Sequence, residues 1–73
     1  MVGEIPLDDK LKDLRKYLES LCRGGRHETA KLVLMRFYKE RLEILEAESA
    51  FIDKDLEIVG LRKIAEEVLG VRL

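Results

Sequence analysis

The one pair of side chains that could support covalent catalysis is Cys22 and His27, which lie five residues apart across Gly24-Gly25. A thiol becomes an effective nucleophile when a neighbouring base takes its proton and a third group orients that base. This requirement for a third group weighs against the pair. We therefore interpret Cys22 as a core thiol and His27 as an exposed residue near a helix start, and we predict that the protein is not an enzyme.

Metal and cofactor chemistry is not expected either. Protein metal sites usually combine several Cys and His side chains, and this chain has one of each. The adjacent carboxylates Glu66 and Glu67 point to different faces of a helix, so we interpret them as solvated surface residues. The sequence predicts neither a metal site nor a cofactor.

The basic residues around the glycine turn point to a different chemistry, the binding of anions. Arg23, Arg26 and His27 bracket Gly24-Gly25, which leads into a predicted helix N-terminus. Free backbone N–H groups and the positive end of the helix dipole favour an anion there, and arginine donors match a phosphate. One interpretation is contact with nucleic-acid phosphates, and the other is an ordinary turn with solvated arginines. The predicted DNA-binding residues, including lysines of the preceding helix, are Lys10, Lys12, Lys16, Arg23, Arg26 and His27.

The element around which the chain is organised is a helix predicted over residues 26–49. Between Leu32 and Tyr38 six of seven side chains are apolar, and Arg36 is the only interruption. A surface helix has one apolar stripe, so a helix that is apolar nearly all round must be covered on more than one side. A chain this short has few elements for that purpose, and the simplest cover is a second copy. The predicted core of this homodimer is Leu32, Val33, Leu34, Phe37 and Tyr38.

Two further helices are predicted on either side of the central one. Leucines spaced by three and four residues form one apolar stripe over residues 8–22, and Gly24-Gly25 ends that helix. A third helix is predicted over residues 55–69, where an aspartate supplies the N-cap and Gly70 ends the helix.

The remaining segments are short. In the turn before the third helix, Phe51 and Ile52 are expected to pack inward. Gly60 lowers the helix propensity of the third helix but would permit a close approach to another helix. Residues 1–7 form an extended segment, which is either a strand that pairs with a partner chain or a disordered tail.

Length and composition limit the protein classes that fit. Seventy-three residues make a single domain, 1–73, near the size at which one core alone can hold a fold, so dimerisation is the expected stabiliser. Charged residues make up 40% of the chain and Asn and Gln are absent, a mix typical of thermophile proteins. The lone cysteine favours an intracellular, cytoplasmic setting. Glu4 and Pro6 interrupt the first apolar residues, so no signal peptide is expected, and no apolar run is long enough to span a membrane.

The net charge of −1 gives no global signal for nucleic-acid binding. The charge is unevenly distributed, however. Residues 1–41 contain ten Lys and Arg against seven Asp and Glu, whereas residues 42–73 contain four against eight. This asymmetry is compatible with one basic face and one acidic face, and the acidic third helix is a candidate surface for a protein partner.

The order of the elements resembles the ribbon-helix-helix family of DNA-binding proteins over residues 2–46. The shared features are a short N-terminal segment, a leucine-striped helix, a glycine turn and a strongly apolar second helix. The resemblance implies that Gly3 to Pro6 of two chains pair into a ribbon that enters the DNA major groove. It also implies that the second helices form the dimer core and that Arg26 and His27 anchor on phosphates. The third helix would be an addition, similar to the three-helix variant seen among archaeal virus proteins, which would act in the host cytoplasm.

Two functions remain open on the sequence. The first is a small homodimer that binds double-stranded DNA largely through its phosphates, with transcriptional regulation as one role. The second is a helical module for protein–protein interaction and dimerisation that binds no nucleic acid. The fold class is mainly α, with a short N-terminal strand and three helices in an intertwined ribbon-helix-helix-like homodimer, or else an all-α three-helix dimer. An intermolecular ribbon at residues 1–7 would favour the first function, and an all-helical core would favour the second.

Overall fold

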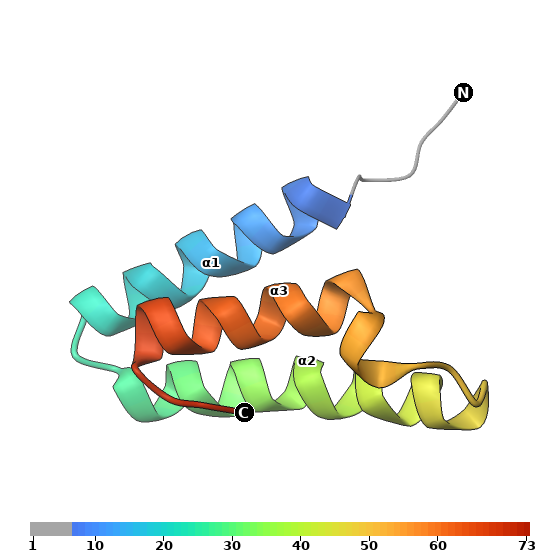
Figure 1. Ribbon diagram of the computed structural model, residues 1–73. Helices are drawn as coiled ribbons and strands as arrows, with labels where there is room; N and C mark the ends of the chain where they lie inside the picture. The colour runs from blue at the N-terminus through green and yellow to red at the C-terminus, as the bar shows by residue number, and fades with distance from the viewer. Residues whose placement is uncertain (1–6) are drawn as a thin grey trace.

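A computed structural model describes residues 7–73 and shows three helices joined by short connections (Figure 1). The elements in chain order are α1 (Leu7–Arg23), α2 (His27–Ala47), the 3-10 turn η1 (Ile52–Lys54), α3 (Leu56–Ile64) and the π-helical turn η2 (Ala65–Leu69). The mainly helical class predicted from the sequence is confirmed, and residues 7–73 contain no strand. The predicted N-terminal strand falls on residues outside this range, except for Leu7, which is helical.

The leucine stripe of α1 forms one wall of the core. Leu18 is fully buried, and the other leucines of the stripe pack around it. The helix ends as predicted at the glycine pair, because Gly25 has a φ of 77°, in the left-handed region that favours glycine. The N–H of Arg26 donates to the carbonyl of Leu21 at 2.8 Å and closes the turn into α2.

The buried stripe of α2 consists of Ala30, Leu34, Tyr38 and Leu45, whose spacing of four, four and seven residues places them on one face. α1 and α3 of the same chain pack against this helix. The hydroxyl of Tyr38 accepts a hydrogen bond from Nε of Arg62 on α3 at 3.2 Å. The core of the described chain is therefore completed without a second copy.

Some residues of the dimer core predicted from the sequence are buried within the single chain, and others are exposed. Leu34 is fully buried and Tyr38 is 8% exposed, so both belong to the core of the single chain. Leu32 and Phe37 remain 71% and 39% exposed, and Val33 is half-buried. The sequence favoured a second copy as the simplest cover of this helix, but Leu34 and Tyr38 are buried by the single chain itself.

Helix α3 begins where the sequence predicts it, at an aspartate cap. Oδ2 of Asp55 accepts a hydrogen bond from the N–H of Ile58 at 3.0 Å. Gly60 faces Leu11 of α1 so closely that a Cβ at this position would overlap the leucine side chain, which confirms the expected close approach. The helix predicted over 55–69 is not uniform, since its last five residues form η2 before Gly70 ends it with a φ of 66°.

The turn between α2 and α3 departs from the prediction in one respect. Ile52 is half-buried against the core, but Phe51 is 80% exposed. The chain turns at Ser49, whose φ is 55°, and Phe51 then adopts an extended conformation in which neighbouring side chains point to opposite sides. The ammonium of Lys54 lies 5.6 Å from the centre of the Phe51 ring and partly covers it. The second helix accordingly ends at Ala47 rather than at residue 49.

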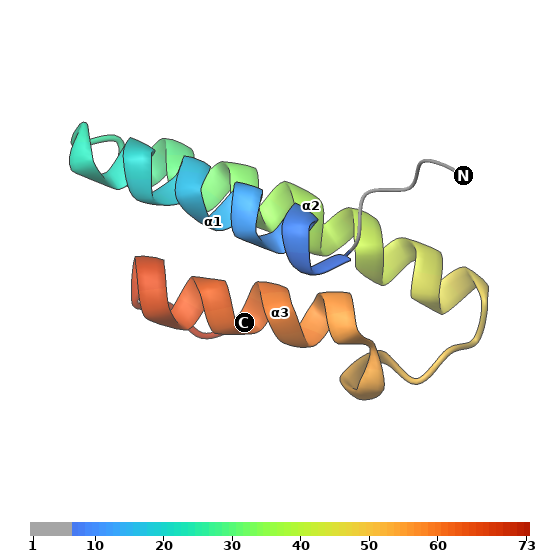
Figure 2. The same ribbon diagram turned by 90° about the horizontal axis from the view of Figure 1, so that it is seen from above.

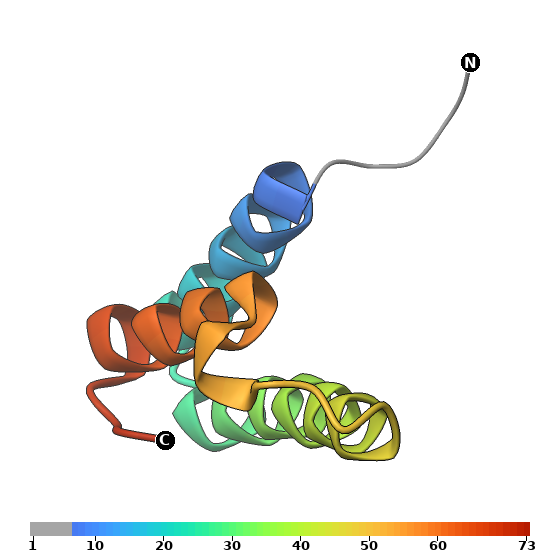
Figure 3. The same ribbon diagram turned by 45° about the vertical axis from the view of Figure 1, so that its right-hand side comes forward.

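α1 and α2 form the two arms of a V that meet at the glycine turn. They are antiparallel, they diverge with distance from the turn, and α3 runs lengthwise beside them (Figures 1 and 3). α3 packs against both arms, and Figure 2 shows it to one side of the α1–α2 pair. The divergence leaves space between the arms at the end away from the glycine turn.

Candidate interaction surfaces

The first candidate surface is a row of basic side chains on the outer side of α1. Lys12, Lys16 and Arg23 are separated by four and seven residues, so they lie on one face of the helix, and all three are exposed. None of them forms an ion pair with a side chain of residues 9–73. Arg26 and His27 are also exposed, at the glycine-turn end of the same helix pair. We call Lys12, Lys16, Arg23, Arg26 and His27 the basic face.

Two carboxylates near the basic face, Glu19 and Glu67, are already engaged. Nη1 of Arg15 lies 2.7 Å from Glu67, and its Nε lies 3.6 Å from Glu19. Hydrogen bonding to Glu67, followed by the attraction of both carboxylates, raises the pKa of Arg15 above its usual value. Arg15 therefore balances the charge of Glu19 and Glu67 beside the row. Asp13, which adjoins Lys12 in sequence, forms no ion pair within residues 9–73.

Two lysines are placed differently from the sequence interpretation. Lys10 does not join the basic face, because it precedes Lys12 by two residues and so points to another side of α1. Its ammonium lies 3.5 Å from Glu57 of α3. Lys63 of α3, which the sequence placed apart from the DNA-binding residues, shares a surface hollow with Lys12. The sequence spacing of two residues between Lys10 and Lys12 was enough to show that they point to different sides of α1. The position of Lys63 could not be predicted in this way, because it depends on how α3 packs.

Cys22 and His27 do not form a catalytic arrangement. Cys22 is half-buried and packs against the core, while His27 is exposed at the start of α2. In residues 7–73 no hydrogen bond connects the two side chains, and no group of three or more His, Cys, Asp and Glu is placed to hold a metal ion.

The packing of Cys22 predicts slow alkylation of its thiol. We expect labelling of the folded protein by a maleimide to be several-fold slower than labelling in concentrated urea, because packing restricts access to the sulfur. Mass spectrometry of timed samples measures both rates on the same chain. Equal rates in the two states would show that the Cys22 side chain does not pack as described.

The second candidate surface is an apolar groove of about 410 Å³ in the space between the arms of the V. Helix α1 supplies one wall, Phe37 of α2 supplies the other, and Leu61 and Glu57 of α3 lie at the floor. Almost all of the exposed lining is apolar. We call this space, lined by Lys10, Leu11, Asp13, Leu14, Tyr17, Phe37, Glu57 and Leu61, the groove.

Two aromatic side chains mark the edge of the groove. Tyr17 is 53% exposed and Phe37 is 39% exposed, although both are large enough to contribute strongly to a buried interface. A second hollow, of about 340 Å³, adjoins them on the α2 side and is lined by Val33, Arg36 and Glu40 as well as the two aromatics. Tyr17 and Phe37 therefore stand between two hollows. None of the residues that line the groove and this hollow was proposed as a binding site from the sequence except Lys10, Val33 and Phe37.

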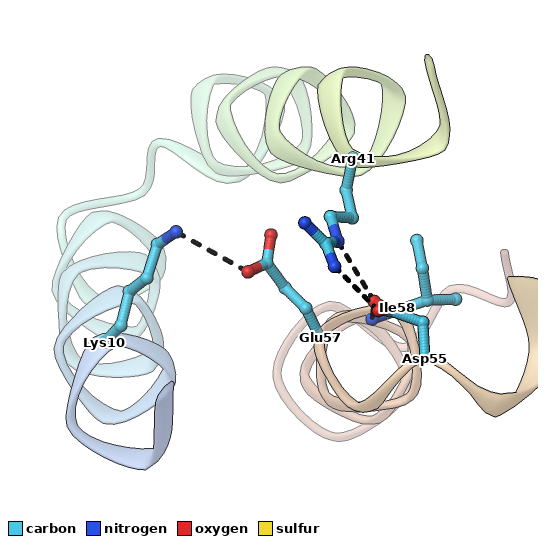
Figure 4. Close-up of polar contacts among 5 residues, drawn as sticks. All are labelled: Lys10, Arg41, Asp55, Glu57 and Ile58. Atoms are coloured by element: carbon cyan, nitrogen blue, oxygen red, sulfur yellow. Dashed lines mark hydrogen bonds and ion pairs between the residues drawn. The ribbon is translucent and has the colours of Figure 1, made fainter. Parts of the chain in front are cut away.

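Ion pairs connect the start of α3 to α1 and to α2 (Figure 4). Two nitrogens of Arg41 on α2 donate to the two carboxylate oxygens of Asp55 at 2.8 and 3.1 Å, and Lys10 of α1 faces Glu57 of α3. The hydrogen bonds from Arg41, helped by the N–H of Ile58, hold the pKa of Asp55 below its usual value. These contacts join the start of α3 to both arms.

The comparisons with known proteins identify no relatives. No protein-family model, no curated protein and no solved structure matches this chain. Among the described residues, no helix combines the length and the apolar character needed to cross a bilayer. The functional argument consequently depends on the two surfaces themselves.

Proposed function

We propose that the protein binds double-stranded DNA through contacts between its basic face and the phosphate backbone. The observation that carries this proposal is the alignment of Lys12, Lys16 and Arg23 along one side of α1, where none of them forms an ion pair with a carboxylate of residues 9–73. Cationic side chains that lack internal partners are available to neutralise an external anion. The overall charge of −1 does not oppose this, because binding depends on the local distribution of charge.

The spacing of the row suits an extended polyanion better than a single phosphate. Lys12 and Arg23 are eleven residues apart, which corresponds to about 16 Å along a helix. Duplex DNA carries one negative charge per about 1.7 Å of its axis, so a row of this length faces several phosphates at once. At the end of the row, no side chain caps the N-terminus of α2 at Arg26, which leaves its first N–H groups open to a phosphate as well.

Recognition of this kind would be largely independent of base sequence. Phosphate contacts fix the position of a protein on the duplex but do not distinguish one base pair from another. We therefore propose weak, salt-sensitive binding, with a dissociation constant of the order of micromolar at physiological salt. The ribbon that would read bases in a ribbon-helix-helix protein falls on residues 1–7, largely outside the described chain, so regulation of specific sites is not part of this proposal.

The groove favours a second candidate function, that of a helical module for protein–protein interaction. Its apolar lining, with Tyr17 and Phe37 exposed at its edge, is the kind of surface that receives an apolar partner. This function and DNA binding use different sides of α1, so the two candidates are compatible.

Reversing the charge of Lys12 and Lys16 should weaken DNA binding substantially. The logarithm of the affinity falls linearly as the logarithm of the salt concentration rises. We expect K12E/K16E to make this slope less steep by about 2, because each of the two substitutions removes one phosphate contact. The measurement is an anisotropy titration of a short labelled duplex between roughly 50 and 200 mM salt, the range over which phosphate binding falls steeply.

The matched control is K39E/K54E, which makes the same change in net charge at exposed lysines of α2 and η1. Neither lysine forms an ion pair in the described chain, and neither is part of the basic face. Circular dichroism should show that both variants remain helical. If the wild type does not bind at low salt, or if the two variants lose affinity equally, the basic face is not a DNA-binding surface.

A further inference from the structure

We infer that the groove is the contact surface between two copies of this chain, arranged about a twofold axis that passes close to Tyr17 and Phe37. This inference goes beyond DNA binding and does not depend on it. It also differs from a dimer built on the whole of α2, since Leu34 and Tyr38 are already covered within the chain. The proposed interface uses one side of α1 and the facing side of α2 instead.

The shape of the surface fits a copy of itself. A twofold interface brings the same patch of both subunits together, so the patch must supply both the projections and the cavities that receive them. Tyr17 and Phe37 are the projections, and the groove and the adjoining hollow lie on either side of them, with volumes of about 410 and 340 Å³. An aromatic side chain of one copy can therefore enter a hollow of the other while the reverse contact forms at the same time.

The charges around the surface also favour a second copy as its partner. Each cation at its edge is already matched by an anion, with Lys10 3.5 Å from Glu57 and Arg36 3.3 Å from Glu40. The lining holds two cations, Lys10 and Arg36, and three anions, Asp13, Glu57 and Glu40, so a strongly charged partner would find little opposite field here. A second copy brings the same nearly balanced set, and a twofold axis can place Arg36 of each chain opposite Glu40 of the other.

The Arg36–Glu40 pair is free to make this exchange. The two side chains are 81% and 59% exposed and lie one helical turn apart, so their contact within the chain contributes little to its stability. In a pair of antiparallel α2 helices, two cross-chain contacts would replace the two local ones. The exchange would also fix the relative position of the two helices along their axes.

The area required is available on a chain of this size. A stable interface buries roughly 800 Å² per partner, which is about a seventh of the 5504 Å² exposed by this chain. The exposed parts of Tyr17 and Phe37, the floor of the groove and the neighbouring Val33 lie at the centre of such a patch. The basic face lies on another side of α1, so pairing would leave it open on both copies.

The first experiment is sedimentation equilibrium of the full chain without DNA over the micromolar range. We expect the wild type to be a dimer and F37E to raise the dimer dissociation constant at least about thirtyfold, the effect of losing a central interface residue. V59E is the matched control, because Val59 is 45% exposed, close to the 39% of Phe37, and lines neither the groove nor the hollow. It lies two residues from both Glu57 and Leu61, so it points to another side of α3, and V59E should associate like the wild type.

The second experiment identifies the occupant as a copy of the chain. R36E and E40R should each pair weakly with themselves, because each places like charges across the twofold axis. Mixing the R36E and E40R chains should give a heterodimer stronger than either homodimer, which contacts within one chain cannot produce. Circular dichroism of every variant checks that it is folded.

A monomeric wild type would overturn the inference, whether or not the protein binds DNA. A dimer that F37E and V59E weaken equally would also overturn it, because the interface would then lie elsewhere. A mixture of R36E and E40R no stronger than its components would refute the twofold arrangement about α2.

Discussion

Replacing Leu34 with alanine should lower the free energy of unfolding by about 2–5 kcal/mol, the usual cost of removing a large buried aliphatic side chain. Leu34 is fully buried in the stripe of α2 that packs against α1 and α3. Truncation removes contacts with both neighbours and leaves a cavity that rigid helices cannot close completely. Domains of this size are often only about 5 kcal/mol stable, so a large part of the population could unfold.

The measurement is urea denaturation followed by circular dichroism at one protein concentration. The control is L32A on the same helix, where the side chain is 71% exposed in the single chain and where alanine favours the helix as well as leucine does. We expect L32A to change the free energy of unfolding by less than about 0.5 kcal/mol. Similar losses from both substitutions would mean that Leu34 is not covered by α3 as described.

Removing the side chain of Asp55 should be the most damaging change among the charged residues. Asp55 caps α3 through the N–H of Ile58 and receives two hydrogen bonds from Arg41. Loss of a cap costs about 0.5–2 kcal/mol, and a partly buried arginine left without its carboxylate adds to that cost. We expect D55A to lose about 2 kcal/mol or more, and D55N to lose less, because asparagine can still accept the hydrogen bond from Ile58.

The pH dependence of stability provides an independent measurement of the same contact. The hydrogen bonds from Arg41 lower the pKa of Asp55 in the folded state below its usual value of 3.8. A carboxylate with a lowered folded-state pKa contributes stability that is fully present above the unfolded-state pKa and is lost as pH falls through the folded-state pKa. The difference in unfolding free energy between wild type and D55N should therefore shrink below about pH 4.

Asp53 supplies the control for both measurements. Its carboxylate faces Nη1 of Arg62 at 3.0 Å, but its side chain is 85% exposed, so the contact is screened by water. We expect D53N to behave like the wild type within about 0.5 kcal/mol at all pH values. If D53N and D55N lose stability alike, the Arg41–Asp55 contact has no special role.

The local features of the fold could be predicted from the sequence because their causes are local. The leucine spacing of α1, the glycine pair that ends it, the Asp55 cap and Gly70 each depend on a few neighbouring residues. The cover of α2 could not be predicted in this way. Whether Leu34 meets another chain or α3 depends on how helices pack, which the apolar pattern of one helix does not determine.

The candidate surfaces show the same limit. The spacing of Lys12, Lys16 and Arg23 was enough to place them on one face, and it was also enough to separate Lys10 from them. The groove was not foreseen, because its lining comes from three helices and its width depends on the angle between α1 and α2. Tyr17, which the leucine pattern left unexplained, acquires a neighbour in Phe37 only in the folded chain.

The short connections between the helices also affect how long apolar side chains of a newly synthesised chain stay exposed. α1 and α2 are separated by only a few residues, so the entropy lost in bringing them together is small. Helical domains dominated by such nearby contacts fold within microseconds to milliseconds. Leu34 and Tyr38, the buried residues of the apolar run, would thus be hidden from other nascent chains soon after α3 is synthesised. Tyr17 and Phe37 stay at the surface of the finished fold.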